Sequence, residues 1–275
     1  MSASHDSTEP RASTEPRTGT EIHGSLAPEV SAASPGSLAP EEATAVRARL
    51  DEVAARVAAA AESAGRPADS VRIMLATKTQ PAARIRAALA HGFTLIGENR
   101  VQELTGKAEA LADVPHEAHL IGPLQKNKVN HALRVATCIQ SIDSLELAQR
   151  IQRRLEATEA RIEYFVQVNT SREDSKSGVA PEAAGELVGA LQGLDRMRMR
   201  GLMTIGLPGS TEVEIRPSYR ELTGLRAALL EQGIIDETMT ELSMGMSNDF
   251  ELAIDEGATM VRIGSSVFGA RPPAG

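Results

Sequence analysis

The chain has 275 residues, which is long enough for one large α/β barrel or for two ordinary domains. Its formal net charge of −8 leaves no broad basic field, and this argues against nucleic acid or an anionic membrane surface as the main partner. The longest apolar runs fall short of the roughly 20 residues of a membrane helix, so we expect no membrane span. The single cysteine, Cys138, fits a reducing compartment, so we expect a cytoplasmic protein.

The first 39 residues differ in composition from the rest of the chain. The stretch at 7–11 recurs at 13–17, and the stretch at 24–29 recurs at 36–41. Short repeats rich in Ser, Thr, Pro and Gly bury too little apolar surface to offset the entropy of an ordered chain. We therefore expect residues 1–39 to form a disordered tail.

An amphipathic helix is predicted from Pro40 to Ala64. Its apolar residues Val46, Leu50, Val53 and Val57 recur at spacings of three or four, and a Gly-Arg-Pro stretch ends it.

Strand-like and helix-like segments then alternate to the end of the chain. The expected strands lie at 71–76, 93–96, 118–121, 138–141, 162–168, 199–203, 240–243 and 260–263. The expected helices lie between them, at 81–91, 99–112, 125–134, 144–157, 181–193, 212–232 and 247–256. Eight strands joined by helices predict a parallel sheet closed into a single-domain (β/α)8 TIM barrel over residues 40–275. An open doubly wound sheet is the alternative, although no Gly-x-Gly-x-x-Gly follows the first strand.

Polar residues follow the ends of these strands, where barrels carry their functional loops. Lys78 follows the four apolar residues 73–76 of the first strand, with only Thr77 between. Such a lysine can be a rim residue with a buried stem and a solvated head. It can also be an amine in a partly desolvated mouth, where its pKa falls and it attacks a carbonyl to form a Schiff base.

The turns after the last two strands have the character of an anion site. Gly245 lets the backbone approach closely, and Ser247 is expected to cap the following helix with free backbone amides beyond it. Gly264, Ser265 and Ser266 repeat this arrangement after the eighth strand. Each turn alone is explained by helix capping, but the pair stands where such barrels usually bind phosphate.

An amine and a phosphate cradle together define a cofactor that carries an aldehyde and a phosphate, and pyridoxal 5′-phosphate (PLP) fits. Arg262 then stands near the pyridine nitrogen, which an arginine keeps unprotonated, weakening the ring as an electron sink. The alternative for Arg262 is an ion pair at the rim, with Asp249 or Glu98.

Seven stretches of the chain resemble, in order, the pyridoxal phosphate homeostasis protein family. They are ATKTQP at 76–81, GENRVQE at 97–103, HLIGPLQKNK at 119–128, SKSG at 175–178, RGLM at 200–203, LSMGMS at 242–247 and VRIGS at 261–265. The resemblance covers about residues 46–271. Departures are Ala118, where an aromatic residue is common, and Thr77, where serine is common.

This resemblance implies a barrel like the N-terminal domain of alanine racemase, with PLP held as an internal aldimine on Lys78. It further implies that Arg262 partners the ring nitrogen, and that Ser247, Gly264 and Ser265 hold the phosphate. Asn99 and Met203 are implied as wall residues.

The resemblance also implies a role in vitamin B6 homeostasis without catalytic turnover. A racemase of this kind needs a second acid/base, supplied by a tyrosine of a further domain. Here Tyr164 falls at the start of the fifth strand and Tyr219 in an expected surface helix. A PLP-dependent racemase and a Schiff-base lyase of the aldolase kind stay open as alternatives. A module that acts through its tail is the non-enzymatic alternative.

The expected partners follow from this interpretation. We expect a monomer that binds PLP and can pass it to apo forms of PLP-dependent enzymes. Lys126, Lys128 and Lys176 are either solvated lysines or a second site that receives PLP during transfer. No two of the six histidines have the i, i+4 spacing of a helical metal site, so we expect no metal.

Overall fold

A computed structural model describes residues 38–173, 176–207 and 211–269 of the chain. The expected tail at 1–39 lies outside these residues except for its last two. Within the described ranges, no helix is long and apolar enough to cross a membrane, and no three His, Cys, Asp or Glu side chains are grouped as metal ligands.

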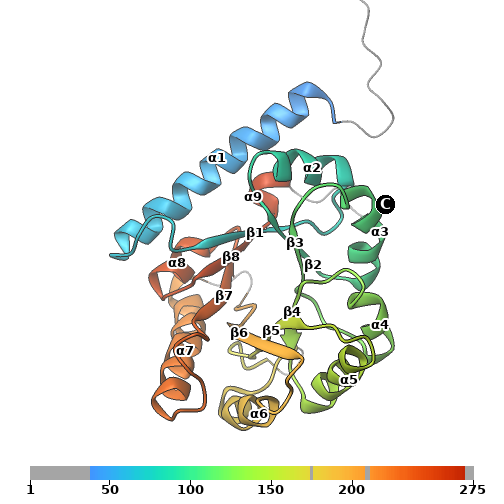
Figure 1. The fold of residues 1–275 in the computed structure, drawn as a ribbon. Helices are drawn as coiled ribbons and strands as arrows, with labels where there is room; N and C mark the ends of the chain where they lie inside the picture. Colours follow the sequence, from blue (N-terminus) through green and yellow to red (C-terminus); the bar gives the residue numbers. More distant parts are fainter. Residues whose placement is uncertain (1–37, 174–175, 208–210, 270–275) are drawn as a thin grey trace, which may run out of the picture. The chain divides into compact units, whose positions relative to one another are not determined.

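The predicted (β/α)8 barrel is confirmed. Parallel strands pair in chain order, and the first pairs with the last to close the sheet (Figure 1). The strands are β1 (Arg72–Ala76), β2 (Leu95–Glu98), β3 (Glu117–Leu120), β4 (Cys138–Ile142), β5 (Ile162–Gln167), β6 (Met197–Met203), β7 (Glu241–Met246) and β8 (Met260–Ile263). Every predicted strand is present, with ends shifted by up to three residues.

Helices surround the sheet, as the alternating pattern predicts. They are α1 (Pro40–Ser63), α2 (Ala82–Ala90), α3 (Val101–Leu111), α4 (Val129–Ala132), α5 (Leu145–Glu156), α6 (Ala184–Leu191), α7 (Glu212–Glu231), α8 (Phe250–Asp255) and α9 (Ser265–Phe268). Two predicted helices begin with a 3₁₀ turn, η1 (Lys126–Lys128) before α4 and η2 (Pro181–Ala183) before α6.

Helix α1 takes the place that a full helix after β8 would occupy in such a barrel. Only the four-residue α9 follows β8 in the described chain, and α1 packs against α2, α8 and α9 (Figure 1). Its buried stripe includes Val46, Leu50, Val53 and Val57, as the spacing predicts. Burial of this apolar stripe supplies most of the free energy that fixes an amphipathic helix.

The barrel interior is filled by a cluster of apolar side chains distinct from the layer between strands and helices. Its members are Met74, Leu95, Ile121, Cys138, Phe165, Met203 and Met260. With no tryptophan in the chain, methionines fill the space that aromatic residues would otherwise take. Cys138 is buried and free, and its burial raises the pKa of the thiol well above its usual value, which makes it unreactive.

Ion pairs close the barrel at the amino ends of the strands. Arg72 Nη2 on β1 lies 2.6 Å from Glu117 Oε1 on β3, and Arg72 Nη1 lies 3.7 Å from Glu241 Oε2 on β7. Arg200 on β6 bonds to Glu163 at 2.9 Å and also to Glu241. This floor lies at the opposite end of the barrel from the residues that the motifs single out.

Glu117, one of the ion-paired residues of this floor, should make the stability of the protein depend on pH. His119 and Arg72 lower the pKa of Glu117 from 4.5 to about 2. A carboxyl whose pKa is lower in the folded chain stabilises the fold above pH 4.5, and that contribution is lost as pH falls toward 2. We expect Glu117→Gln to lower the free energy of unfolding at pH 7 by about 1 kcal/mol at most, because Glu117 is half-exposed.

Urea unfolding at a series of pH values measures this effect. The difference between Glu117→Gln and wild type should shrink as pH falls from 4.5 toward 2. The matched control is Glu186→Gln at an exposed glutamate of α6, which should show no such trend. A difference that stays constant with pH would show that Glu117 acts through packing rather than charge.

Candidate functional site

A cavity of about 650 Å³ opens at the carboxyl ends of the strands. Its volume falls within the range of about 300–1,000 Å³ that is usual for small-molecule sites. Six of the seven predicted site residues line it, namely Lys78, Asn99, Ser247, Arg262, Gly264 and Ser265. Met203 does not line it, because the side chain is fully buried in the apolar cluster inside the barrel.

Lys78 lies on the turn that connects β1 to α2. The side chain is exposed at the edge of the cavity, two residues beyond the end of the strand. The next residue, Thr79, has a φ of 64°, a conformation that is uncommon for a β-branched residue. Such strain persists only where surrounding contacts fix the backbone.

Two carboxylates from the neighbouring β2–α3 segment hold this turn from either side of Lys78. The hydroxyl of Thr77 donates to Glu98 Oε1 at 2.6 Å. The backbone N–H of Thr79 donates to Glu103 Oε2, also at 2.6 Å. Lys78 is thus the projecting residue of a turn whose two flanking residues are both anchored.

A buried ion pair completes the anchor. Lys107 Nζ on α3 lies 2.6 Å from Glu98 Oε1 and donates to the carbonyl of Thr77 at 2.8 Å. Glu98 is fully buried, and its Oε2 has no partner, so burial raises the pKa of this carboxyl against the opposing effect of Lys107. Sequence reasoning missed this role of Glu98. The available signal was a carboxylate at the end of an apolar strand, which requires a partner.

Ser247 does not cap the helix after β7, contrary to the prediction. Gly245 turns the chain at a φ of 90°, Asp249 accepts the N–H of Met246 at 2.6 Å, and α8 begins only at Phe250. The tight turn therefore ends before the helix starts, and the Ser247 side chain points away from the first turn of α8. Its hydroxyl oxygen accepts the backbone N–H of Gly264 at 3.0 Å and that of Ser266 at 3.5 Å.

The two predicted anion turns therefore meet at one oxygen atom. Backbone N–H groups from the turn after β8 converge on the hydroxyl oxygen of Ser247 from the turn after β7, and an anionic oxygen that displaced this hydroxyl would meet the same donors. Glycine allows a close approach here, because a Cβ at Gly264 would lie 3.1 Å from the carbonyl oxygen of Ala76, and the backbone would have to shift by a few tenths of an ångström to make room. This close approach brings the anion turn beside the turn that carries Lys78.

Arg262 lines the cavity from β8 and is 5% exposed. Its Nη1 donates to Ser243 Oγ at 2.9 Å, and its Nη2 donates to the carbonyl of Thr204 at 2.6 Å. These neutral partners replace the ion pair with Asp249 or Glu98 that was the alternative. Burial lowers the pKa of Arg262, but an arginine keeps its proton in a protein.

Tyr219 is not on the surface, contrary to the expectation for its helix. The side chain is fully buried on the inner face of α7, and its hydroxyl has no hydrogen-bond partner. Burial, together with the nearby Asp249, raises the pKa of Tyr219 well above its usual value. Tyr219 packs against Gly206 and does not line the cavity.

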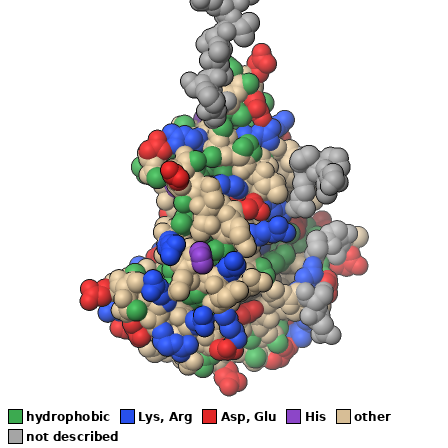
Figure 2. Space-filling model, turned by 90° about the vertical axis from the view of Figure 1, so that its right-hand side faces the viewer, with side chains coloured by type: hydrophobic (Ala, Val, Ile, Leu, Met, Phe, Trp, Pro, Cys, Tyr) green, Lys and Arg blue, Asp and Glu red, His purple; other side chains and the backbone are tan. Residues whose placement is uncertain are grey.

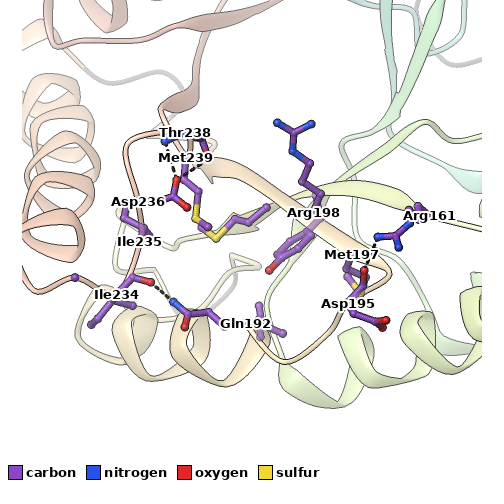
Figure 3. A pocket seen from close by; sticks show the side chains of 14 residues that line it. Arg161, Gln192, Asp195, Met197, Arg198, Ile234, Ile235, Asp236, Thr238 and Met239 are labelled. Atoms are coloured by element: carbon purple, nitrogen blue, oxygen red, sulfur yellow. Dashed lines mark hydrogen bonds between the residues drawn. The ribbon is translucent and has the colours of Figure 1, made fainter.

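Tyr164 borders a second cavity of about 600 Å³ at the amino ends of β5 and β6 (Figure 3). Arg161 bonds there to the carbonyl of Asp195 at 2.8 Å, and Asp236 accepts from Thr238. Burial raises the pKa of Tyr164 to about 12. Its place at the amino end of the barrel, which the sequence predicts, separates Tyr164 from Lys78.

The three further lysines considered from the sequence do not line the main cavity. Lys126 pairs with Glu146, and Lys176 Nζ lies 3.7 Å from Glu173. Figure 2 shows Lys and Arg side chains gathered on the face that carries α3, α4 and α5. Solvated lysines and a second PLP site both stay as interpretations of these three residues.

The chain matches known proteins over most of its length. A family model described as "Alanine racemase, N-terminal domain" matches residues 48–272. A pyridoxal phosphate homeostasis protein of Pseudomonas aeruginosa is 42% identical over 222 residues, covering 81% of this chain and 94% of that protein. One of Aquifex aeolicus is 40% identical over 223 residues, covering 81% and 97%.

Solved structures agree with the sequence relatives. PipY of Synechococcus elongatus, solved with PLP bound, is 33% identical with a TM-score of 0.71, covering 82% of this chain and all of that one. An unknown protein from Bifidobacterium adolescentis is 40% identical with a TM-score of 0.80, covering 84% and 97%. An alanine racemase from Streptomyces lavendulae shares the fold at 17% identity and a TM-score of 0.65, covering 84% and 58%.

Proposed function

We propose that this chain, which belongs to the family of pyridoxal phosphate homeostasis proteins, binds PLP in the cavity at the carboxyl ends of its strands and serves the homeostasis of that cofactor. One observation carries the proposal. A single cavity is lined by an exposed lysine, a buried arginine and a turn whose backbone N–H groups converge on one oxygen. These are the groups that an aldehyde, a pyridine nitrogen and a phosphate require.

Each residue is assigned by its place in the cavity. Lys78 would hold the cofactor through Nζ, the amine that an aldehyde group requires. Gly264, Ser265 and Ser247 would bind the phosphate, whose oxygen would take the place of the Ser247 hydroxyl as acceptor of the Gly264 N–H. Asn99 forms part of the wall.

Two further residues of the proposed site, Arg262 and Met203, are buried. Arg262 would face the ring nitrogen, and Met203 packs among the apolar side chains inside the barrel rather than in the cavity wall.

Arg262 favours holding the cofactor over catalysis. When bound, PLP supplies an electron-withdrawing ring, and this effect is strongest with a protonated ring nitrogen. An arginine has five N–H donors and no acceptor, so it keeps the nitrogen it faces unprotonated. The ring is then a weak electron sink.

The positions of the tyrosines argue against a two-base racemase. Neither Tyr164 nor Tyr219 lines the cavity, and burial raises the pKa of both hydroxyls, so neither exchanges a proton near neutral pH at this site. The lyase alternative is separated by experiment, because a lyase would carry a substrate carbon on Lys78 without PLP.

Reduction with borohydride tests the proposed function. The protein mixed with PLP is reduced, digested and mapped by mass spectrometry. We expect one pyridoxyl group per chain on Lys78 and none on Lys126, Lys128 or Lys176. Trapping of a sugar-phosphate carbon on colourless protein would favour the lyase instead. Sustained turnover of L-amino acids by the loaded protein would contradict a holding role.

The proposal also covers the domain organisation, oligomeric state, location and recipients of this protein. We propose a tail at 1–39 before a barrel domain at 40–275, a monomeric cytoplasmic protein, and apo forms of PLP-dependent enzymes as recipients. Transfer is measured as activity regained by an apo-enzyme mixed with loaded protein, and sedimentation gives the oligomeric state. If deletion of residues 1–39 abolished transfer while PLP still bound, the tail rather than the barrel would carry the interaction.

A further inference from the structure

A line of buried polar side chains crosses the barrel interior beneath Arg262. Ser243 on β7 and Gln140 on β4 are fully buried, and His119 on β3 is 2% exposed. They lie among the apolar side chains that fill the barrel, where a polar group without a hydrogen bond is costly. Apolar residues would fill this space without that cost, so the polar line calls for an explanation.

The side chains form one continuous chain of hydrogen bonds. Arg262 Nη1 donates to Ser243 Oγ at 2.9 Å, and Ser243 Oγ donates to Gln140 Oε1 at 2.7 Å. Gln140 Nε2 lies 3.0 Å from His119 Nδ1 and 3.2 Å from Met260 Sδ. This series of hydrogen bonds thus links Arg262, which lines the cavity from β8, to His119 on β3 at the opposite side of the barrel.

The donor and acceptor groups of these side chains make every hydrogen bond in the series run from Arg262 toward His119. Arg262 can only donate, so Ser243 Oγ accepts from it, and Oε1 of Gln140, which faces Ser243 at 2.7 Å, accepts the serine proton. Gln140 then presents its NH₂ group to His119, and Nδ1 of the imidazole must be unprotonated to accept it. His119 is therefore neutral, with its proton on Nε2.

The surroundings of His119 fit this tautomer. Nε2 makes no hydrogen bond, but Glu117 Oε2 lies 3.5 Å away, where a carboxylate attracts an N–H group, and Glu117 also accepts from Arg72. Burial lowers the pKa of His119. The charged groups that face it are Glu117 on its own strand, Arg72 on β1 and Glu241 on β7, so the last residue of the relay lies beside the ion pairs of the barrel floor.

We propose that Gln140 and His119 are positioning residues, which hold the Arg262 guanidinium in one orientation toward the cavity through the relay of Ser243. Without Gln140, Ser243 has no fixed acceptor for its proton and is free to rotate. Arg262 is then held firmly only by the carbonyl of Thr204. The relay itself stands on the contacts above, and only its consequence for bound PLP rests on the proposed function.

Nitrogen-15 NMR of the full chain without added PLP tests the relay directly. In wild type we expect His119 to show the Nε2–H tautomer and the Arg262 guanidinium to rotate slowly about its Nε–Cζ bond. In Gln140→Leu we expect that rotation to be at least about tenfold faster and His119 to lose its single tautomer. The matched control is Gln152→Leu, a buried glutamine of α5 outside the relay, which should change neither signal.

A second pair of variants serves if Gln140→Leu does not fold. His119→Asn supplies an amide oxygen that can accept from Gln140, whereas His119→Phe supplies no acceptor. We expect slow rotation of Arg262 in the first and fast rotation in the second. Equal rotation in both, or wild-type rotation in a folded Gln140→Leu, would overturn the proposal.

Absorbance of the PLP-loaded protein gives the consequence for the cofactor. Gln140→Leu should shift the absorbance maximum of bound PLP, because the guanidinium facing the ring nitrogen is no longer fixed, while Gln152→Leu should leave it unchanged. If wild type binds no PLP, the proposed function fails, and the NMR result on the cofactor-free chain still decides the relay. An unshifted maximum in a Gln140→Leu protein with mobile Arg262 would overturn the link to the cofactor.

Discussion

Lys78→Ala should abolish the visible absorbance band that forms when the protein is mixed with PLP. Among the described residues that line the cavity, Lys78 is the only lysine, and Arg262 cannot lose a proton to become a nucleophile. Removing the amine leaves only the phosphate and ring contacts. We expect the Kd for PLP to rise at least about 100-fold, which corresponds to ~2.7 kcal/mol. Spectroscopic titration and equilibrium dialysis measure the two effects.

Two control variants separate the amine from its charge and from lysines in general. Lys78→Arg keeps a cation at the cavity edge but offers no nucleophile, so it should bind PLP weakly and without the band. Lys126→Ala removes an exposed lysine outside the cavity and should behave as wild type. A band in Lys78→Ala that borohydride still traps would assign the amine to another residue.

The fold could be predicted because its signals are local. Buried parallel strands appear as short, mostly apolar runs, and β1 and β8 are such runs, whereas β4 and β5 also carry polar residues such as Gln140 and Glu163. The largest error in a strand end is at β7, which continues to Met246 rather than ending at Ser243. Ser243 and Gly245 lower the strand propensity there, and the register with β8 shifts across the same residues.

The candidate site was predictable where it depends on position along a strand. Lys78, Asn99, Ser247, Arg262, Gly264 and Ser265 all follow or end strands, and a barrel brings the carboxyl ends of its strands together.

What the sequence did not indicate are contacts between distant segments. Lys107 reaches Thr77 from 30 residues away, and Gln140 reaches Ser243 from 103 residues away. No local periodicity specifies such pairs. Tyr219 was misplaced for a related reason, since the spacing of apolar residues alone did not show which face of its helix packs on the barrel.

Lys107→Met should cause the largest loss of stability among these substitutions. It removes the cation beside Glu98, whose side chain is fully buried and already has one oxygen without a partner. Breaking a buried pair by removing one member typically costs about 3–5 kcal/mol, because the remaining charge is left uncompensated. We expect a decrease of that size in the free energy of unfolding, measured by urea denaturation at neutral pH.

The double variant Lys107→Met/Glu98→Gln distinguishes charge compensation from the geometry of the turn. A neutral glutamine can still accept from Thr77 and no longer needs a cation, so most of the lost stability should return. The turn that carries Lys78 would still lack the bond from Lys107 to the carbonyl of Thr77, and Thr79 would still be strained. The double variant should therefore be stable yet react more slowly with PLP than wild type does, as measured by stopped-flow absorbance. If stability stays as low as in Lys107→Met, the essential interaction is the bond to Thr77 rather than compensation of the buried charge.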